Sequence, residues 1–120
     1  MKTIGIAATC ISLSIISFCF NAKDSFAEID VDGTYKMVCE LCHGPDGKGT
    51  LQGQKFKVPD FSDKEWQSKV SDEDMIKTMT DGSDNPKYSE GVIPLLEMIG
   101  IENPKDVIPE FIPKVRSFAK

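Results

Sequence analysis

Residues 39–43 carry the side chains of this chain that are best suited to covalent and metal chemistry. They read Cys-Glu-Leu-Cys-His, two thiols separated by two residues with an imidazole directly after the second. This spacing serves three chemistries in proteins: a redox-active dithiol, half of a zinc site, or covalent attachment of a haem with the histidine on its iron. The rest of the sequence decides among them.

Two of these chemistries need groups that the sequence does not supply. A structural zinc site takes four ligands, but His43 is the single histidine, and Cys39 and Cys42 are the only cysteines outside an apolar leader. A thioredoxin-like dithiol belongs to a βαβ unit, and no strand-like alternation precedes Cys39. The motif therefore indicates one haem c, bound covalently through Cys39 and Cys42, with His43 as an iron ligand.

Residues 1–27 have the features of a secretory signal peptide. A basic start precedes an apolar run at 4–20, and small side chains occupy the two key positions before a cut after Ala27. The run approaches the roughly 20 residues that span a bilayer, so an uncleaved anchor is the alternative, but polar residues before the cut favour cleavage. Cys10 and Cys19 would leave with the leader, and the protein would be periplasmic or otherwise exported.

Cleavage would leave residues 28–120 as one small domain. Of the 14 basic and 19 acidic residues, the leader removes two and one, which leaves 12 and 18 and a formal charge of −6. Such an acidic protein is not expected to bind nucleic acid and would be attracted to basic patches on partner proteins. We expect a monomer or weak dimer with no stable membrane anchor, in which a buried haem supplies much of the core.

Apolar spacing and capping residues predict one helix that contains the motif cysteines and further helices after it. The first covers 29–42, with Asp32 as its N-terminal cap. Residues 44–61 are predicted to be irregular because of their glycines and prolines. A short helix then begins at Ser62, which has a glutamate three residues later, as in a capping box.

The clearest predicted helix follows Ser71, which begins a second capping box and precedes an apolar stripe that ends at residue 81. A last helix is predicted over 104–118, where apolar residues recur at helical spacing. Pro109 and Pro113 interrupt it, and each removes a backbone donor. We therefore expect a kinked or two-piece helix there.

Residues 37–49 resemble the haem-binding segment of class I c-type cytochromes, which include small bacterial monohaem proteins. The similarity continues through 59–67, 71–82 and 115–118. It implies an all-α, class I cytochrome c fold, in which the N- and C-terminal helices cross, with Tyr35 packed between them, around a covalently bound haem. It also implies an electron carrier rather than an enzyme, which passes single electrons between redox partner proteins.

The resemblance implies roles for individual residues. Cys39 and Cys42 match the two haem-attachment cysteines, and His43 matches the proximal ligand. Pro45 matches a proline whose carbonyl accepts a hydrogen bond from the other ring nitrogen of that histidine. Trp66 lies near a family tryptophan that contacts a haem propionate, and an ordinary core aromatic is the alternative.

The sixth ligand of the iron is where the sequence departs from the family. A methionine followed by proline usually precedes the last helix, but the matching residues are Ile93 and Pro94, and isoleucine cannot bind iron. We expect Met98 to take this place; Met79, Met75 or an open site are the alternatives. A His/Met pair suits outer-sphere electron transfer, whereas an open position admits peroxide or NO.

Two further functions stay open at this point. A five-coordinate iron would make the chain a peroxidase-like or gas-binding haem protein, although no distal histidine or arginine is evident. Alternatively, the chain is the haem subunit of a larger redox complex, with residues 92–101 as its contact face rather than as a cover over the haem. We interpret the lysines after the motif as solvated surface rather than as a docking ring: Lys48, Lys55, Lys57, Lys64 and Lys69.

Overall fold

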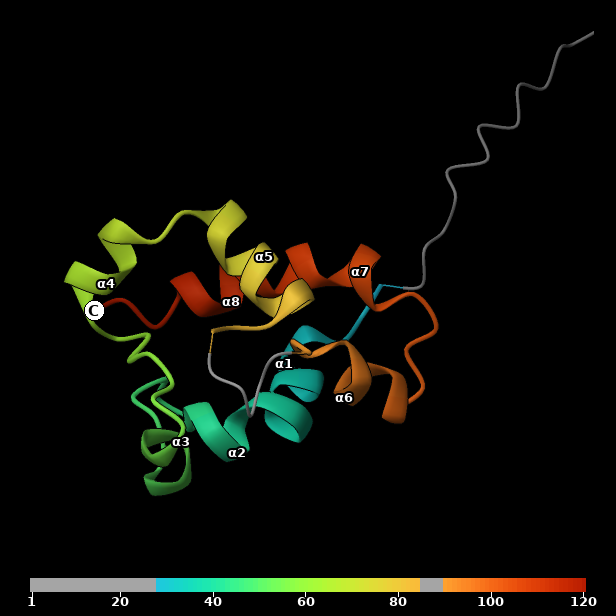
Figure 1. The fold of residues 1–120 in the computed structure, drawn as a ribbon, viewed down its shortest axis with the longest axis horizontal. Coiled ribbons are helices and arrows are strands. Elements are labelled where there is room, and N and C mark those ends of the chain that lie inside the picture. The colour runs from blue at the N-terminus through green and yellow to red at the C-terminus, as the bar shows by residue number, and fades with distance from the viewer. Residues whose placement is uncertain (1–27, 85–89) are drawn as a thin grey trace, which may run out of the picture.

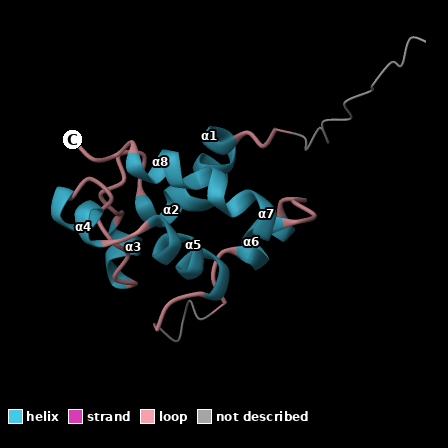
Figure 2. Cartoon of the chain, turned by 90° about the horizontal axis from the view of Figure 1, so that it is seen from above, coloured by secondary structure: helices cyan, strands magenta, loops and turns pink. Residues whose placement is uncertain are grey.

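The computed structural model describes residues 28–84 and 90–120. The described residues form short helices joined by turns, with no β-strand among them (Figures 1 and 2). This arrangement confirms the predicted all-α fold. The predicted signal peptide, residues 1–27, lies outside the described residues, and no helix within the described part is long and apolar enough to cross a membrane.

The first helix is built from three consecutive segments: α1 (Val31–Thr34), the π-helical turn η1 (Tyr35–Cys39) and α2 (Glu40–His43). Its cap is Asp30, whose carboxylate accepts a hydrogen bond from the backbone N–H of Gly33 at 2.9 Å. The predicted cap, Asp32, lies inside the first turn and pairs instead with Lys114 at 2.7 Å. A π-turn inserts extra backbone into a helix and often marks a functional site.

The glycine-rich segment after the motif contains a short helix, α3 (Leu51–Lys55). The prediction that 44–61 is wholly irregular was therefore wrong. Thr50 begins the helix, because its hydroxyl accepts a hydrogen bond from the backbone N–H of Gly53 at 3.0 Å. This cap outweighs the low helix propensity of glycine.

The next helix, α4 (Lys64–Lys69), begins one residue later than predicted. Its cap is Asp63, whose carboxylate accepts a hydrogen bond from the backbone N–H of Glu65 at 2.8 Å. The hydroxyl of Ser62, the predicted cap, donates to the Asp60 carboxylate at 2.6 Å instead. Both residues are good caps, and the neighbouring Asp60 decides between them.

Helix α5 (Asp72–Asp81) confirms the clearest sequence prediction. Ser71 and Asp74 form the capping box, in which each side chain accepts a hydrogen bond from the backbone N–H of the other. The helix ends at Gly82, whose φ of 87° favours glycine.

The last part of the chain forms the segments α6 (Ile93–Met98), α7 (Pro104–Val107), the 3-10 turn η3 (Ile108–Phe111) and α8 (Ile112–Arg116). The interrupted helix predicted over 104–118 is confirmed as the run from α7 to α8. Pro109 and Pro113 each lie in the first turn of a new segment, where the missing N–H is not needed.

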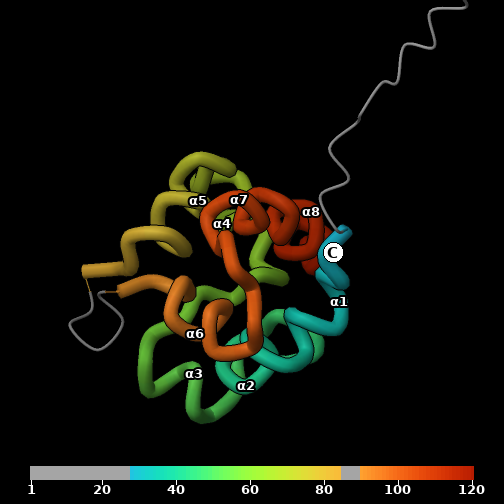
Figure 3. The backbone as a smooth tube through the Cα atoms, turned by 90° about the vertical axis from the view of Figure 1, so that its right-hand side faces the viewer, coloured from blue at the N-terminus to red at the C-terminus, as the bar shows by residue number. Residues whose placement is uncertain are grey.

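The apolar core has two parts. One lies where the first helix passes α8 (Figure 3). The rings of Tyr35 and Phe118 meet there with their centroids 5.3 Å apart. The other contains Leu96, Ile108 and Phe111, between α6 and η3. The predicted crossing of the N- and C-terminal helices is therefore present, with Tyr35 at the contact.

A polar clamp around Arg116 joins α8 to α4 and α5. The guanidinium donates to the backbone carbonyls of Gln67 and Val70 at 2.6 and 2.8 Å, and to the Asp72 carboxylate at 2.6 and 2.9 Å. The side-chain amide of Gln67 also donates to the carbonyls of Phe61 and Val115. The planar fork of arginine suits several acceptors at once.

We expect Arg116→Ala to lower the free energy of unfolding by about 2–3 kcal/mol, because it leaves several partly buried acceptors without a donor. Urea unfolding of the haem-loaded protein measures this. Arg116→Lys keeps the charge without the fork and should lose part of the same stability. Lys77→Ala, which breaks only the exposed pair with Asp81, is the control and should change little. Equal stability of the Arg116 and Lys77 variants would contradict the clamp.

Candidate functional site

A cavity of about 280 Å³ lies between the first helix, residues 56–61, α5 and residues 91–96. Its lining is mostly apolar, and its volume lies close to the lower end of the range for cofactor pockets, about 300–1,000 Å³. Figures 1 and 3 show α5 on one side of this region and α2 and α3 on the other. The cavity is therefore enclosed by elements that are distant in sequence.

The structure brings Cys39, Cys42 and His43 together on the first-helix wall of this cavity. Both cysteines are free thiols and are partly buried. Burial raises the pKa of the Cys39 thiol to about 11, and the neighbouring Cys42 adds to the shift. Cys39 is therefore a neutral thiol near pH 7.

His43 is held flat against Phe61, with ring centroids 4.2 Å apart and an angle of 13° between the planes. Burial lowers the pKa of His43 to about 4, so the imidazole is neutral, the state that binds a metal ion. Its Nδ1 atom is buried and has no hydrogen-bond partner among the described residues. The predicted bond from this nitrogen to the carbonyl of Pro45 is therefore not formed in this structure.

Residues that follow the motif satisfy its backbone carbonyls. The last carbonyls of a helix lack partners within it, and here the backbone N–H groups of Gly49 and Thr50 donate to the carbonyls of His43 and Cys42, both at 2.8 Å. The Thr50 hydroxyl donates to the carbonyl of Leu41 at 2.7 Å. These bonds draw α3 against the end of the motif helix.

Gly53 allows the closest contact between α3 and the motif. A Cβ atom at this position would lie 1.9 Å from the carbonyl oxygen of Cys42 and 2.8 Å from a methyl group of Val58. The first distance is far below any contact that a real side chain makes, so only glycine fits. The glycines of this segment suggested a loop, and the sequence held no signal for this contact.

The structure does not place Met98 at the cavity. Met98 is 74% exposed and is absent from the cavity wall, whereas Leu96 of the same helix is buried and lines it. Residues two apart in an α-helix point about 200° away from each other, so a helix that buries Leu96 turns Met98 to solvent. Residues 93–98 were not predicted to be helical, and their helical form places Met98 away from the cavity.

Met75 and Met79 of α5 both line the cavity. Met75 is buried in the core cluster beside the first helix, whereas Met79 is partly buried and contacts both core clusters. Val92 and Leu95 line the wall near the end of α5. Val92, Leu95 and Leu96 therefore form part of the cavity wall, and the expectation that residues 92–101 cover a haem stays a prediction.

Trp66 and Phe61 complete the wall near the histidine. The two rings are tilted by 38° with centroids 5.3 Å apart, and both line the cavity. Trp66 also packs against the first core cluster, so its position fits both predicted roles. The role of Phe61 was missed, because an isolated phenylalanine in an irregular segment gives no periodic signal.

These groups fit a covalently attached haem. Two thiols and a neutral imidazole lie on one wall, the remaining wall is largely apolar, and a buried ring nitrogen still lacks a polar partner. A haem ring needs an apolar enclosure together with an axial nitrogen, and its vinyl groups need two thiols. By contrast, no group of three or more His, Cys, Asp or Glu side chains that could hold a bare metal ion occurs within 28–84 and 90–120.

Solved structures similar to this chain include the c-type cytochrome KustC0563. It shares 30% sequence identity over 77% of this chain and 100% of its own length, with a TM-score of 0.62. A point mutant of Kustc0563 shares 29% identity over 75% of this chain and 99% of its own, with a TM-score of 0.59. No protein-family model and no curated protein matches this chain.

We expect Gly53→Ala to lower the free energy of unfolding by at least about 1–3 kcal/mol, the usual cost of overpacking. The added methyl group would clash with the backbone of Cys42, which cannot move away as a flexible side chain could. It should also lower the fraction of chains that carry haem, because it pushes α3 away from Cys42. Gln54→Ala, at an exposed position of the same helix, is the control and should keep both properties. Urea unfolding and haem content per chain are the measurements, and wild-type values for Gly53→Ala would show that α3 need not approach so closely.

Proposed function

This chain belongs to the c-type cytochromes, and on that premise we propose that it is an exported monohaem protein that carries single electrons between redox partner proteins. The observation that carries this proposal is the meeting of Cys39, Cys42 and His43 on one wall of an apolar cavity. The 93 residues after the proposed cleavage site are enough to surround one haem and little else.

A haem bound here supplies a redox-active iron. The thiols of Cys39 and Cys42 would hold it as thioethers, and neutral His43 would donate a ring nitrogen to the iron. Phe61 keeps that imidazole in one plane, and Trp66 lies beside it on the wall. The apolar lining would lower the polarity around the haem, which favours the less charged, reduced state of the iron.

We propose Met79 as the sixth ligand. Within the described residues, the sulfur atoms on the α5 wall belong to Met75 and Met79. Met75 is only 5% exposed and fills the core between the first helix and α8. To bind the iron, its side chain would have to leave this core. Met79 lies one turn further along α5, against Val92, whose backbone N–H donates to its carbonyl at 2.8 Å.

The cavity lining supports electron transfer rather than catalysis. Apart from His43, the described lining residues include no histidine, arginine or carboxylate. Cleavage of a peroxide bond needs such a group to move protons, whereas outer-sphere electron transfer needs none. The alternative is an open, ligand-binding iron. It is favoured only by Val92 and Leu95 on the wall, because their aliphatic side chains cannot bind iron.

Features of the sequence support the proposed export and partner binding. The leader at 1–27 would direct the chain out of the cytoplasm. The acidic surface, with a formal charge of −6 after cleavage, would draw the protein to basic patches on its redox partners. Salt should weaken such encounters.

The proposed function predicts a mature protein that begins at Glu28 and carries one haem. Mass spectrometry of the exported protein and an alkaline pyridine spectrum measure these properties. A spectroelectrochemical titration should follow a reversible one-electron curve, and the reduced protein should not bind CO. A ferrous protein that binds CO readily would support the open-site alternative instead.

The proposed ligand predicts distinct spectra for three methionine variants. Met79→Leu should remove the weak long-wavelength band of methionine-bound ferric haem, give high-spin features and lower the midpoint potential, because a thioether favours ferrous iron. Met75→Leu should cost less than about 1.5 kcal/mol of stability, as a volume-conserving core change, and keep the band. Met98→Leu is the surface control and should match the wild type. Loss of the band in Met75→Leu alone would assign the iron to Met75.

A further inference from the structure

We propose that Lys57 binds a haem propionate and thereby raises the midpoint potential of the iron. This inference rests on the proposed function, since it assumes that a haem occupies the cavity. A haem is an apolar ring with two carboxylate groups, and a carboxylate held near an apolar wall is costly without a cationic or hydrogen-bonding partner. The question is which residue of this chain supplies one.

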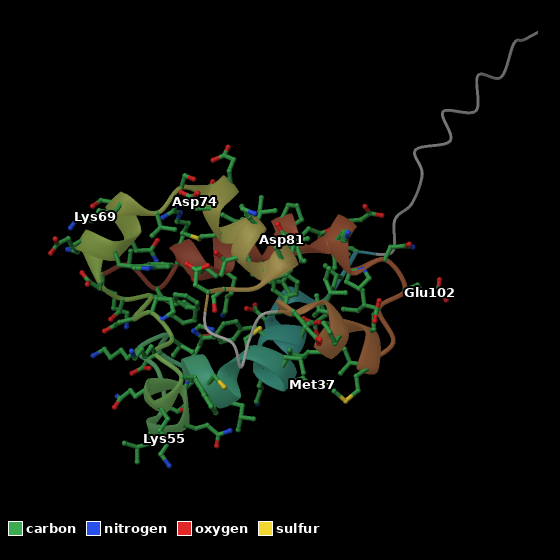
Figure 4. All side chains as sticks on the ribbon, in the orientation of Figure 1. Met37, Lys55, Lys69, Asp74, Asp81 and Glu102 are labelled. Carbon is green, nitrogen blue, oxygen red and sulfur yellow. The ribbon has the colours of Figure 1, made fainter. Side chains whose placement is uncertain are left out.

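Lys57 is the one lysine, arginine or carboxylate residue among the described residues that line the cavity. It makes no ion pair with another described residue. Two other lysines of this region lie elsewhere. Lys69 pairs with Glu65, and Lys55 lies on α3 at the outer edge of the molecule (Figure 4). The cavity therefore has a single cationic side chain at its wall.

The backbone of Lys57 provides an independent observation. Its φ is 56°, and it is the sole non-glycine residue with positive φ in the described part of the chain. It follows Phe56, the C-cap of α3. The backbone N–H of Lys57 donates to the carbonyl of Gln54 at 3.1 Å, and that of Val58 donates to the carbonyl of Gly53 at 3.2 Å. This pair of hydrogen bonds defines a Schellman motif, in which glycine usually occupies the position of Lys57.

A lysine at this position costs about 1 kcal/mol or more relative to glycine. The α3 helix would end at least as well with glycine there, so the local fold gives no reason for the lysine. A residue held in an unfavourable backbone region often has a functional role. Here the strained position directs the chain from α3 into the cavity wall formed by Val58 and Phe61.

The location favours a propionate over the iron as the partner of Lys57. Its segment packs on the histidine side of the cavity, because Phe61 stacks on His43 and Val58 lies beside Gly53. The sixth-ligand position, which we propose that Met79 fills, would face the α5 wall rather than the histidine wall. A lysine on the histidine wall would therefore meet the edge of a bound haem, where its carboxylates lie, rather than the sixth-ligand position.

The test measures midpoint potentials of haem-loaded variants by spectroelectrochemistry. We expect Lys57→Met and Lys57→Gly to lower the potential, because each removes a positive charge that disfavours ferric iron, while Lys57→Arg retains the wild-type value. Lys57→Gly should at the same time raise the free energy of unfolding, since it relieves the positive φ. Lys55→Met removes a charge from the same helix end and should leave the potential unchanged.

The outcomes separate this inference from the proposed function. A potential for Lys57→Met and Lys57→Gly equal to that of Lys55→Met would overturn the inference and leave Lys57 as solvated surface. A change of spin state in Lys57→Met would also overturn it, in favour of lysine as an iron ligand. Chains that take up no haem in the wild type would instead refute the proposed function itself.

Discussion

The rest of the site depends on how the carbonyl end of the motif helix is held. Gly49 and Thr50 satisfy the carbonyls of His43 and Cys42, and Gly53 lets α3 pack directly on that turn. The same contact fixes where the chain re-enters the cavity wall, so that Phe61 meets the imidazole of His43. The motif residues therefore face the cavity only because the segment that follows them folds back onto their own backbone.

The C-terminal helix holds this arrangement from the other side. Tyr35 packs on Phe118, and its hydroxyl donates to the carbonyl of Gly44 at 2.9 Å, directly after the motif. Burial raises the pKa of Tyr35, so the phenol keeps the proton that makes this bond. The Arg116 clamp then ties α8 to α4 and α5, so one short helix links both walls of the cavity.

Sequence patterns predicted those features whose causes are local. The capping box at Ser71 and the broken last helix need only neighbouring residues, and both are present. The motif residues were identified because their chemistry requires a fixed spacing. Gly53 and Phe61 were missed because their importance comes from contacts with residues far along the chain. Met98 was expected because it is the methionine nearest to Ile93 and Pro94, the usual place of the ligand, that still precedes the last helix. Which face of α6 would be buried could not be read from the sequence.

Two pairs of residues in this protein show how side-chain chemistry and backbone geometry decide function together. Met79 and Met98 offer the same thioether, but the face of its helix gives only Met79 access to the cavity. Lys55 and Lys57 carry the same charge, but the turn that ends α3 directs only Lys57 to the cavity wall. The potential of a haem here would thus be set by the geometry of two helix segments, α5 and the end of α3. A substitution that preserved every charge could still change the potential if it moved either one.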